Sequence, residues 1–488
     1  MNNSLKKQLL SVVMAAVMVF SMLPTTAWAA MVENRSAAGQ TRTEQKKDGN
    51  DAYAVIQDAE NGVAVRAAAA VRAPVVKNVV EIDLTDGVDH RSEYGVGGGW
   101  DWVAGAKWLR LENVQIIASG EYALKLPDGA TVEVVGDCSI TGGGAGGSAV
   151  WSKGKVTVEL EEDASLTVGG LGWHTDGDMT VKQSYGSGGE LIVNFGGDKS
   201  GNFTSGAAIR AFRSNLTVNG VTVTANGGSA VKDGKSYGVF ASNVFVENGG
   251  TLIADGGSAS NTDTSYGISA FVNVDNGTII ATGGKGAKSF GISSGSLTAD
   301  NGAVITATGG EVARDVNASI VPLSVGISVD GSATLGRATV NANGGVAPCG
   351  TNFASVGLQM TSGSRLTVNS GGVVNANGGQ LTKGSSTNEK NGFSAGINMA
   401  GASDADLLVN GTGSVTAIGN PTRTDGVTVR SYGVNHTDIG LLTIKLSDAA
   451  SFKAAGGTAA SRVAFSPDTV SIKGSAAYKD FVNVTDGY

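Results

Sequence analysis

Residues 251–310 read TLIADGGSASNTDTSYGISAFVNVDNGTIIATGGKGAKSFGISSGSLTADNGAVITATGG. Three segments within this stretch, TLIADGG, TIIATGG and VITATGG, share one pattern, in which alternating apolar and polar residues precede two glycines. Alternation with a period of two residues indicates a β-strand that buries one face. One such unit cannot bury that face by itself, so successive units are expected to stack on one another.

The same pattern, a predicted strand followed by a pair of small residues, recurs along most of the chain. The second residues of these pairs are Gly143, Gly170, Gly197, Gly228, Gly257, Gly284, Gly310, Gly345, Gly379, Asn420 and Gly457. A second landmark lies inside the later repeats, where a glycine stands between an apolar residue and Ile, Val or Leu. Its glycines are Gly238, Gly267, Gly291, Gly326, Gly357, Gly396 and Gly433.

This repetition predicts an all-β parallel β-helix solenoid of about eleven or more turns, in which each strand pairs with its counterpart one turn later. The segment between a glycine pair and the next landmark varies most in length, so we expect length-variable loops on one corner. Glycine and asparagine are expected at corners that need a positive φ. Tyr237, Tyr266, Phe290 and Tyr432 share one repeat position with aliphatic residues, which predicts a core position for them.

Composition excludes several other classes of protein. The chain has 488 residues with 74 glycines, but only seven prolines and no glycine period of three, which excludes collagen. The formal net charge of −8 disfavours nucleic-acid binding, which needs a basic stripe. The hydrophobic fraction of 41% is too high for a disordered chain.

The first residues have the composition of an export signal. Two lysines precede an apolar run, and Ala27-Trp28-Ala29 follows as a cleavage site, so residues 1–29 are predicted to be a signal peptide. Residues 30–75 are predicted to be a flexible linker and residues 76–488 the solenoid. We expect a secreted, extracellular or cell-surface monomer without a membrane span after cleavage.

The region at about 76–120 is predicted to cover the open first turn, with Trp100, Trp102 and Trp108 as a cap. The stretch GGGWDWVAGAKWLRLENVQIIASGEYALKLPDGATVEVVGDCSITGG, Gly97 to Gly143, is similar to modules labelled carbohydrate-binding in repetitive secreted or surface-displayed proteins of Gram-positive bacteria. The repeats resemble right-handed parallel β-helices of the pectate-lyase type. This resemblance covers about residues 76–488 and implies export with surface adhesion or glycan contact.

A candidate glycan patch follows from the alignment of GWHTDG with VGISVDG, which makes Trp173 an inward residue and His174 an outward one. In the preceding repeat, AVWSKG places Trp151 outward and level with His174, and Arg210 of AIRAF continues the row. Aromatic rings that are flanked by hydrogen-bond donors are typical of sugar-binding sites. A random surface aromatic residue is the alternative.

The variable loops supply a second set of candidate residues, because recognition often resides in loops on one side of a rigid scaffold. They are Arg314, Asp315, Lys383, Glu389, Lys390, Arg423 and Asp425. Simple tolerance of insertions at a corner is the alternative explanation.

No catalytic motif emerges, so the sequence predicts adhesion or glycan binding without catalysis, cofactor or metal. A polysaccharide lyase or glycoside hydrolase on the same scaffold is one alternative, and a passive stalk is another. Asn261-Thr262-Asp263 matches one hydrolase element without its companions, and Asp404 with Asp406 is expected to be a solvated pair. Cys138 and Cys349 lie seven repeats apart, about 34 Å along the axis, which is too far for a disulfide.

Overall fold

The structure is a computed structural model of the whole chain. It describes residues 42–45, 53–56, 74–90, 98–144, 147–196, 205–229, 234–259, 262–312, 321–349, 353–361, 364–383, 392–400, 405–420, 430–436, 442–447, 449–456, 462–466 and 470–473. The chain divides into two units, residues 1–73 and 74–488. In the first unit, β1 (Arg42–Gln45) and β2 (Tyr53–Ile56) pair antiparallel where the sequence predicts only a linker.

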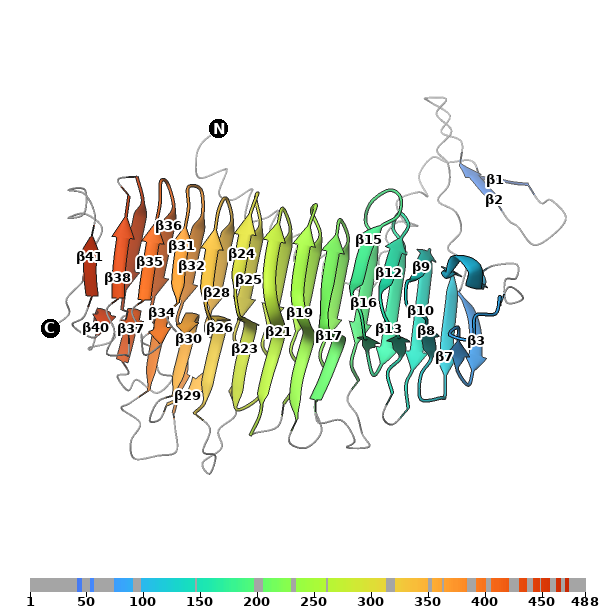
Figure 1. Cartoon of the computed structure of the whole chain (residues 1–488), viewed down its shortest axis with the longest axis horizontal. Helices are drawn as coiled ribbons and strands as arrows, with labels where there is room; N and C mark the ends of the chain where they lie inside the picture. Colours follow the sequence, from blue (N-terminus) through green and yellow to red (C-terminus); the bar gives the residue numbers. More distant parts are fainter. Residues whose placement is uncertain are drawn as a thin grey trace. The chain divides into compact units, whose positions relative to one another are not determined.

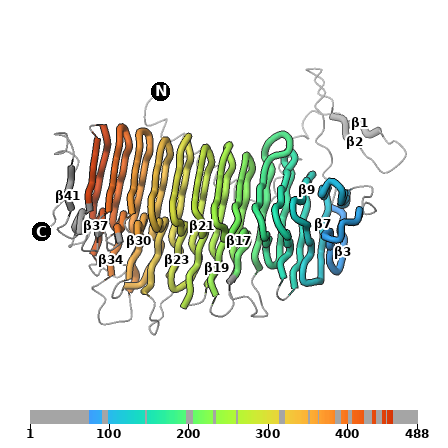
Figure 2. The backbone as a smooth tube through the Cα atoms, in the orientation of Figure 1, coloured from blue at the N-terminus to red at the C-terminus, as the bar shows by residue number. Residues whose placement is uncertain are grey.

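The second unit contains a sheet of 13 parallel strands (Figure 1). These strands are β3 (Val75–Val79), β7 (Val114–Ala118), β10 (Asp137–Gly142), β13 (Ser165–Gly170), β16 (Glu190–Asn194), β18 (Thr222–Asn226), β20 (Thr251–Asp255), β22 (Thr278–Thr282), β25 (Val304–Thr308), β28 (Thr339–Asn343), β32 (Val373–Asn377), β36 (Ser414–Ile418) and β39 (Ser451–Ala455). They follow one another in sequence order, as the backbone tube also shows (Figure 2).

A second sheet of 24 strands completes each repeat. Its strands are β4 (Ile82–Asp83), β5 (Gly99–Val103), β6 (Trp108–Glu112), β8 (Leu124–Leu126), β9 (Ala130–Val135), β11 (Val150–Ser152), β12 (Val156–Leu160), β14 (Trp173–Thr175), β15 (Met179–Gln183), β17 (Ser205–Asn219), β19 (Lys235–Glu247), β21 (Thr264–Asp275), β23 (Lys288–Ser294), β24 (Leu297–Asp300), β26 (Leu323–Val329), β27 (Ser332–Leu335), β30 (Ala354–Thr361), β31 (Arg365–Val368), β34 (Phe393–Ala400), β35 (Ala405–Val409), β37 (Arg430–His436), β38 (Leu442–Leu446), β40 (Arg462–Ser466) and β41 (Val470–Lys473). Its strands pair in parallel except for β5 with β6. The one described helix is the short η1 (Ala104–Ala106).

The predicted all-β class and the stacking of successive repeats are confirmed. Asp255 is level with Thr282, and Thr282 with Thr308. The glycine pairs that follow these residues therefore come directly after the ends of adjacent strands. Inward residues of both sheets form one continuous buried cluster that runs from Ile82 to Ala454. Such an arrangement is consistent with a β-solenoid.

Asparagines occupy one corner with the predicted backbone conformation, because Asn248, Asn276 and Asn301 have φ values of 53°, 53° and 55°. Among the described glycine pairs, Gly143 and Gly170 also have a positive φ, whereas the later described pairs do not. Gly284 and Gly310 are needed because the chain of the preceding repeat lies so close. A Cβ atom on Gly310 would lie 1.9 Å from the carbonyl oxygen of Gly283.

A column of buried serines holds these glycine pairs in place. The serines are fully buried and stand two residues before the glycine of the second landmark: Ser236, Ser265, Ser289, Ser324, Ser355, Ser394 and Ser431. Ser289 illustrates their role, since its Oγ donates to the Gly284 carbonyl at 2.8 Å and accepts from the Gly310 N–H at 2.8 Å. Ser236, Ser265, Ser324 and Ser394 link two successive repeats in the same way through a buried hydroxyl.

The aromatic residues at the position after these serines do not belong to the shared core. The rings of Tyr237 and Tyr266 stack with centroids 4.9 Å apart, and those of Tyr266 and Phe290 with centroids 5.4 Å apart. Phe290 packs in a separate cluster with Val325, Ala354 and Val356. The prediction that this is a core position is confirmed for Tyr237, Phe290 and Tyr432, which are buried, whereas Tyr266 is half-buried.

The residues of the predicted cap lie on the early strands β5 and β6 of the second unit. β5 and β6 form an antiparallel pair, and β6 continues into parallel pairing with β9. Trp100 and Trp102 are buried in the main core, whereas Trp108 is half-buried. Cys138 lies in the main core and Cys349 in a small separate cluster, and no disulfide joins them.

Candidate functional site

The three residues of the predicted glycan patch lie next to one another on adjacent strands. Trp151 of β11 is level with His174 of β14, and His174 is level with Arg210 of β17. Lys125 precedes Trp151 in the same register, and Phe240 follows Arg210. We call Lys125, Trp151, His174, Arg210 and Phe240 the outer row; neighbours within it are one strand spacing apart, about 4.8 Å.

The inward residues between these positions fix the direction of the outer row. Trp173 is 1% exposed and is level with Val150 on one side and Ile209 on the other, all in the main core. Its Nε1 donates to the buried Ser152 Oγ at 3.1 Å. Because side chains alternate along a strand, this anchoring directs Trp151 and His174 to the opposite face.

At its first end the outer row is extended by another aromatic ring. The ring of Tyr122 packs on Trp151 with centroids 5.8 Å apart and planes tilted by 41°. Lys125 Nζ lies 5.0 Å from the centroid of the Tyr122 ring and also forms ion pairs with Glu81 at 2.5 Å and Asp83 at 3.4 Å. The positive charge of Lys125 is therefore already compensated within the protein.

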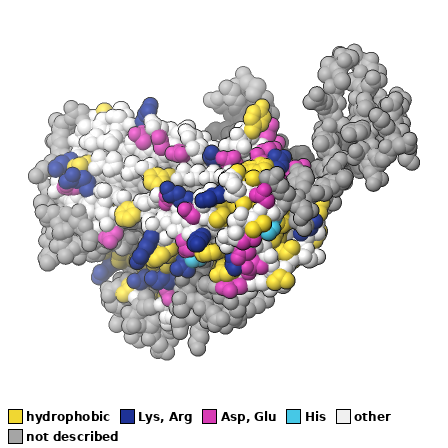
Figure 3. Space-filling model, turned by 45° about the vertical axis from the view of Figure 1, so that its right-hand side comes forward, with side chains coloured by type: hydrophobic (Ala, Val, Ile, Leu, Met, Phe, Trp, Pro, Cys, Tyr) yellow, Lys and Arg dark blue, Asp and Glu magenta, His cyan; other side chains and the backbone are white. Residues whose placement is uncertain are grey.

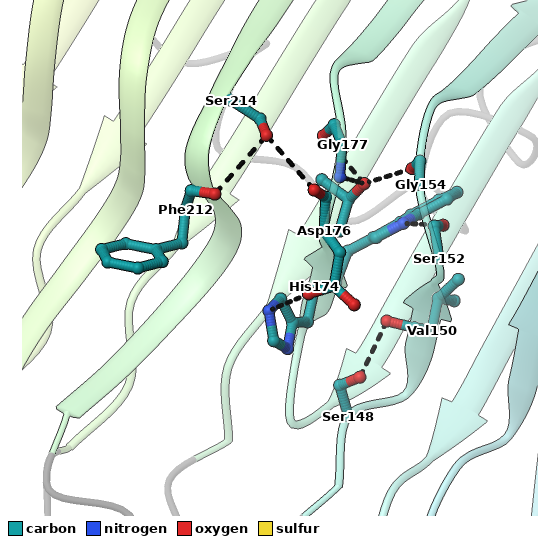
Figure 4. A network of polar contacts seen from close by, with 11 residues as sticks. Ser148, Val150, Ser152, Gly154, His174, Asp176, Gly177, Phe212 and Ser214 are labelled. Atoms are coloured by element: carbon teal, nitrogen blue, oxygen red, sulfur yellow. Dashed lines mark hydrogen bonds and ion pairs between the residues drawn. The ribbon is translucent and has the colours of Figure 1, made fainter. Parts of the chain in front are cut away.

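His174 lies beside Asp176, in a region with several separate polar contacts (Figure 4). Its Nε2 is 3.3 Å from Asp176 Oδ1, and its side chain is 30% exposed. Burial lowers the pKa of His174, the positive charge of Arg210 lowers it further, and Asp176 opposes both. The imidazole is therefore neutral near pH 7; its single N–H lies on Nε2, which faces the Asp176 carboxylate, so Nδ1 is left as an acceptor for a ligand.

Replacing Arg210 by glutamine is expected to raise the pKa of His174 toward 6.5, because a nearby positive charge is removed. In the unaltered protein the folded state binds this proton more weakly than the unfolded state. The stability contribution of His174 is thus complete above pH 6.5 and falls as the pH drops below that value. Titration of the imidazole C–H signals by NMR measures the change, with Arg365→Gln as a remote control. If the His174 signals titrated identically in Arg210→Gln and in Arg365→Gln, Arg210 would not be lowering the pKa of His174.

A bulge in β17 brings further residues to the outer row. The pairing of β17 with β19 shifts between Ala211 and Asn215, which leaves Phe212, Arg213 and Ser214 outside the regular register. Phe212 is 43% exposed and stacks on Phe240 with centroids 5.7 Å apart. Ser214 Oγ lies 3.4 Å from the carbonyl oxygens of both Asp176 and Phe212, so it ties the bulge to the neighbouring strand (Figure 4).

Sequence reasoning missed Tyr122, Phe212, Arg213 and Phe240. The available signal was the length of the segment AIRAFRSNLTV, which has two more residues between its inward Ala211 and Leu216 than VFASNVFV has between Ala241 and Val244. On the face drawn in Figure 3, basic, acidic, histidine and hydrophobic side chains lie beside one another, whereas the white area at the upper left carries few of them.

Of the loop candidates, Lys383 is the one that lies among the described residues. Lys383 is exposed and directly follows β33 (Leu381–Thr382), which pairs in parallel with β29 (Ala347–Pro348). Val312, Ala347, Cys349 and Leu381 pack together, so the described beginnings of these loops stack on one side. Arg314, Asp315, Glu389, Lys390, Arg423 and Asp425 lie outside the described residues.

Other candidate groups add no catalytic constellation. Asp406 is not a lone solvated carboxylate as predicted, because Arg365 donates to its Oδ2 at 2.9 Å; Asp404 and Asn261 lie outside the described residues. Across the described ranges, no group of three or more His, Cys, Asp or Glu residues is arranged to hold a metal ion. Within the same ranges, no helix has the length and apolar character that spanning a membrane requires.

Comparisons with protein-family models, with curated proteins and with solved structures found no match to this chain.

Proposed function

We propose that this chain is a secreted or cell-surface glycan-binding module that serves adhesion, built on a right-handed parallel β-helix of eleven or more turns. The observation that carries the proposal is the outer row, in which Trp151 and Phe240 flank His174 and Arg210 at regular spacing. Aromatic rings can stack on the apolar faces of sugars, while the polar side chains bond hydroxyl groups. Export rests on the signal-like sequence of residues 1–29.

The arrangement of the outer row suits an extended ligand better than a small one. Its members come from five successive strand positions, β8, β11, β14, β17 and β19, and each member is half-buried. A row of side chains one strand apart extends about 19 Å from the first member to the fifth. This length suits several consecutive sugar units of a glycan chain, so we propose an oligosaccharide or polysaccharide as the ligand.

Replacing Trp151 by alanine is expected to weaken glycan binding at least about tenfold, because the ring that supports the sugar face is lost. The measurement is a glycan array probed with the mature protein and the variant, followed by titration of the hits. Phe271→Ala is a matched control, since Phe271 is 50% exposed on β21 but lies outside the outer row. Equal binding by all three proteins would exclude Trp151 from the site.

The enzymatic alternative is tested separately. Incubation with polygalacturonate and other polysaccharides, monitored for unsaturated products and for new reducing ends, distinguishes a lyase or a hydrolase from a binding module. Sustained turnover would overturn the proposal of a non-catalytic protein.

A further inference from the structure

Two arginines approach the same exposed ring beside the outer row. Arg210 Cζ lies 5.7 Å from the centroid of the Phe212 ring, and Arg213 Cζ lies 5.2 Å from it. Cation–π contacts of this length hold guanidinium groups in place without consuming their N–H donors. The terminal N–H donors of both guanidinium groups therefore remain available for an acceptor outside the protein, whereas the Nε of Arg210 is buried.

Neither arginine has an acidic partner in the part of the chain that the structure describes. By contrast, Arg110, which is also partly buried, pairs with Glu112 and Glu133, and the more exposed Arg365 pairs with Asp406. The nearby Asp176 is instead engaged with His174. Arg210 and Arg213 thus add two positive charges with no ion-pair partner in the described chain.

The Nε atom of Arg210 shows that this charged group is poorly compensated within the described protein. It is buried and has no hydrogen-bond partner among the described residues. A buried donor that remains unpaired is costly, and a charged one more so. An external acceptor could not reach Nε itself, but it could bond the terminal nitrogens of the same guanidinium and compensate the charge that they share with Nε.

The backbone of the bulge is the third observation. Arg213 has a φ of 61°, a left-handed conformation that is unfavourable for a non-glycine residue. The bulge is held there because the Asn215 N–H donates to Asp178 Oδ1 at 3.0 Å and Ser214 is buried against Asp176. Strained residues that are fixed by their surroundings cluster at functional sites.

We propose that Arg210, Arg213 and Phe212 form an anion subsite that binds the carboxylate or sulfate group of an acidic sugar. The guanidinium groups bond the oxygens of the anion, and the Phe212 ring supports the adjoining sugar carbons. This inference rests on the proposed glycan-binding function and names the class of glycan. Trp151 and His174 then contact the neighbouring units of the same chain.

The test is an array that presents neutral, carboxylated and sulfated saccharides, probed with the mature protein at two salt concentrations. Each carboxylated hit is also presented after reduction of its carboxyl group to an alcohol, which removes the charge and keeps the sugar. The variants are Arg210→Gln and Arg213→Gly, with Arg365→Gln as the matched control. Arg213→Gly also removes the unfavourable φ, so its thermal midpoint should not fall below that of the unaltered protein.

We expect binding to acidic saccharides that weakens at high salt and is lost on carboxyl reduction. Each of the two arginine variants should bind at least about tenfold more weakly, equal to about 1.4 kcal/mol, while Arg365→Gln binds normally. Stronger binding to carboxylated or to sulfated saccharides shows which of the two groups the subsite binds. Binding to neutral saccharides alone, or unchanged binding by both variants, overturns the anion subsite and leaves the glycan-binding function intact. No binding to any saccharide overturns both.

Discussion

Replacing Gly310 by alanine is expected to lower the free energy of unfolding by about 3 kcal/mol or more. The added Cβ atom would lie 1.9 Å from the carbonyl oxygen of Gly283 and 2.4 Å from that of Gly284. Backbone atoms cannot move aside as a flexible side chain can. A shift of Gly310 would also disturb its hydrogen bonds with Ser289 and Ser324, both at 2.8 Å.

Urea denaturation followed by circular dichroism measures this loss, and Gly105→Ala is the matched control. A Cβ atom on Gly105 meets no atom within 4 Å, and its φ lies outside the left-handed region. The same chemical change at Gly105 is therefore expected to leave the unfolding midpoint nearly unchanged. If Gly310→Ala and Gly105→Ala unfolded at the same urea concentration, close packing against the preceding repeat would not be the reason that position 310 requires glycine.

The stacking of the repeats was predictable because it depends on periodic features of the sequence. Alternation along each strand places Ile279 and Ile305 inward, and the regular spacing of the glycine pairs aligns them on adjacent strands. The reason for the glycines was not predictable in the same way. A glycine that is required by a neighbouring backbone and one that is required by a positive φ look identical in a sequence.

Buried hydroxyl groups escaped prediction for a related reason. Serine at positions such as Ser265 and Ser289 is ordinarily exposed, so its recurrence beside the second landmark was compatible with a surface turn. Only the arrangement of strands reveals that each hydroxyl bonds to the glycine pairs of two successive repeats. The serine column depends on hydrogen bonds between residues about twenty positions apart. The sequence around each serine does not show which distant residue it will contact.

The candidate site was predictable where the strands are regular and not where they bulge. An alignment of the repeats without gaps was enough to predict that Trp151, His174 and Arg210 lie level with one another. It succeeded because β11, β14 and the first part of β17 pair without interruption. Phe212 and Arg213 follow directly, but the register shift removes the strand alternation from which their direction could be read. The contact of both arginines with one ring is therefore a feature of the structure alone.

Replacing Trp173 by alanine is expected to lower the free energy of unfolding by about 3–5 kcal/mol, since it removes one of the largest fully buried side chains. The buried hydroxyl of Ser152 would also lose the Nε1 donor that lies 3.1 Å from it.

Trp151→Ala is the matched control, because Trp151 lies one strand away with its side chain on the opposite face. Trp151→Ala should lower the free energy of unfolding by less than about 1 kcal/mol, as for a partly exposed residue, yet it should weaken glycan binding at the outer row at least about tenfold. Urea denaturation of both variants, together with glycan titration of Trp151→Ala, separates the two roles. If Trp151→Ala lost as much stability as Trp173→Ala, both rings would serve the fold. Trp151 could then no longer be assigned to ligand binding at the outer row.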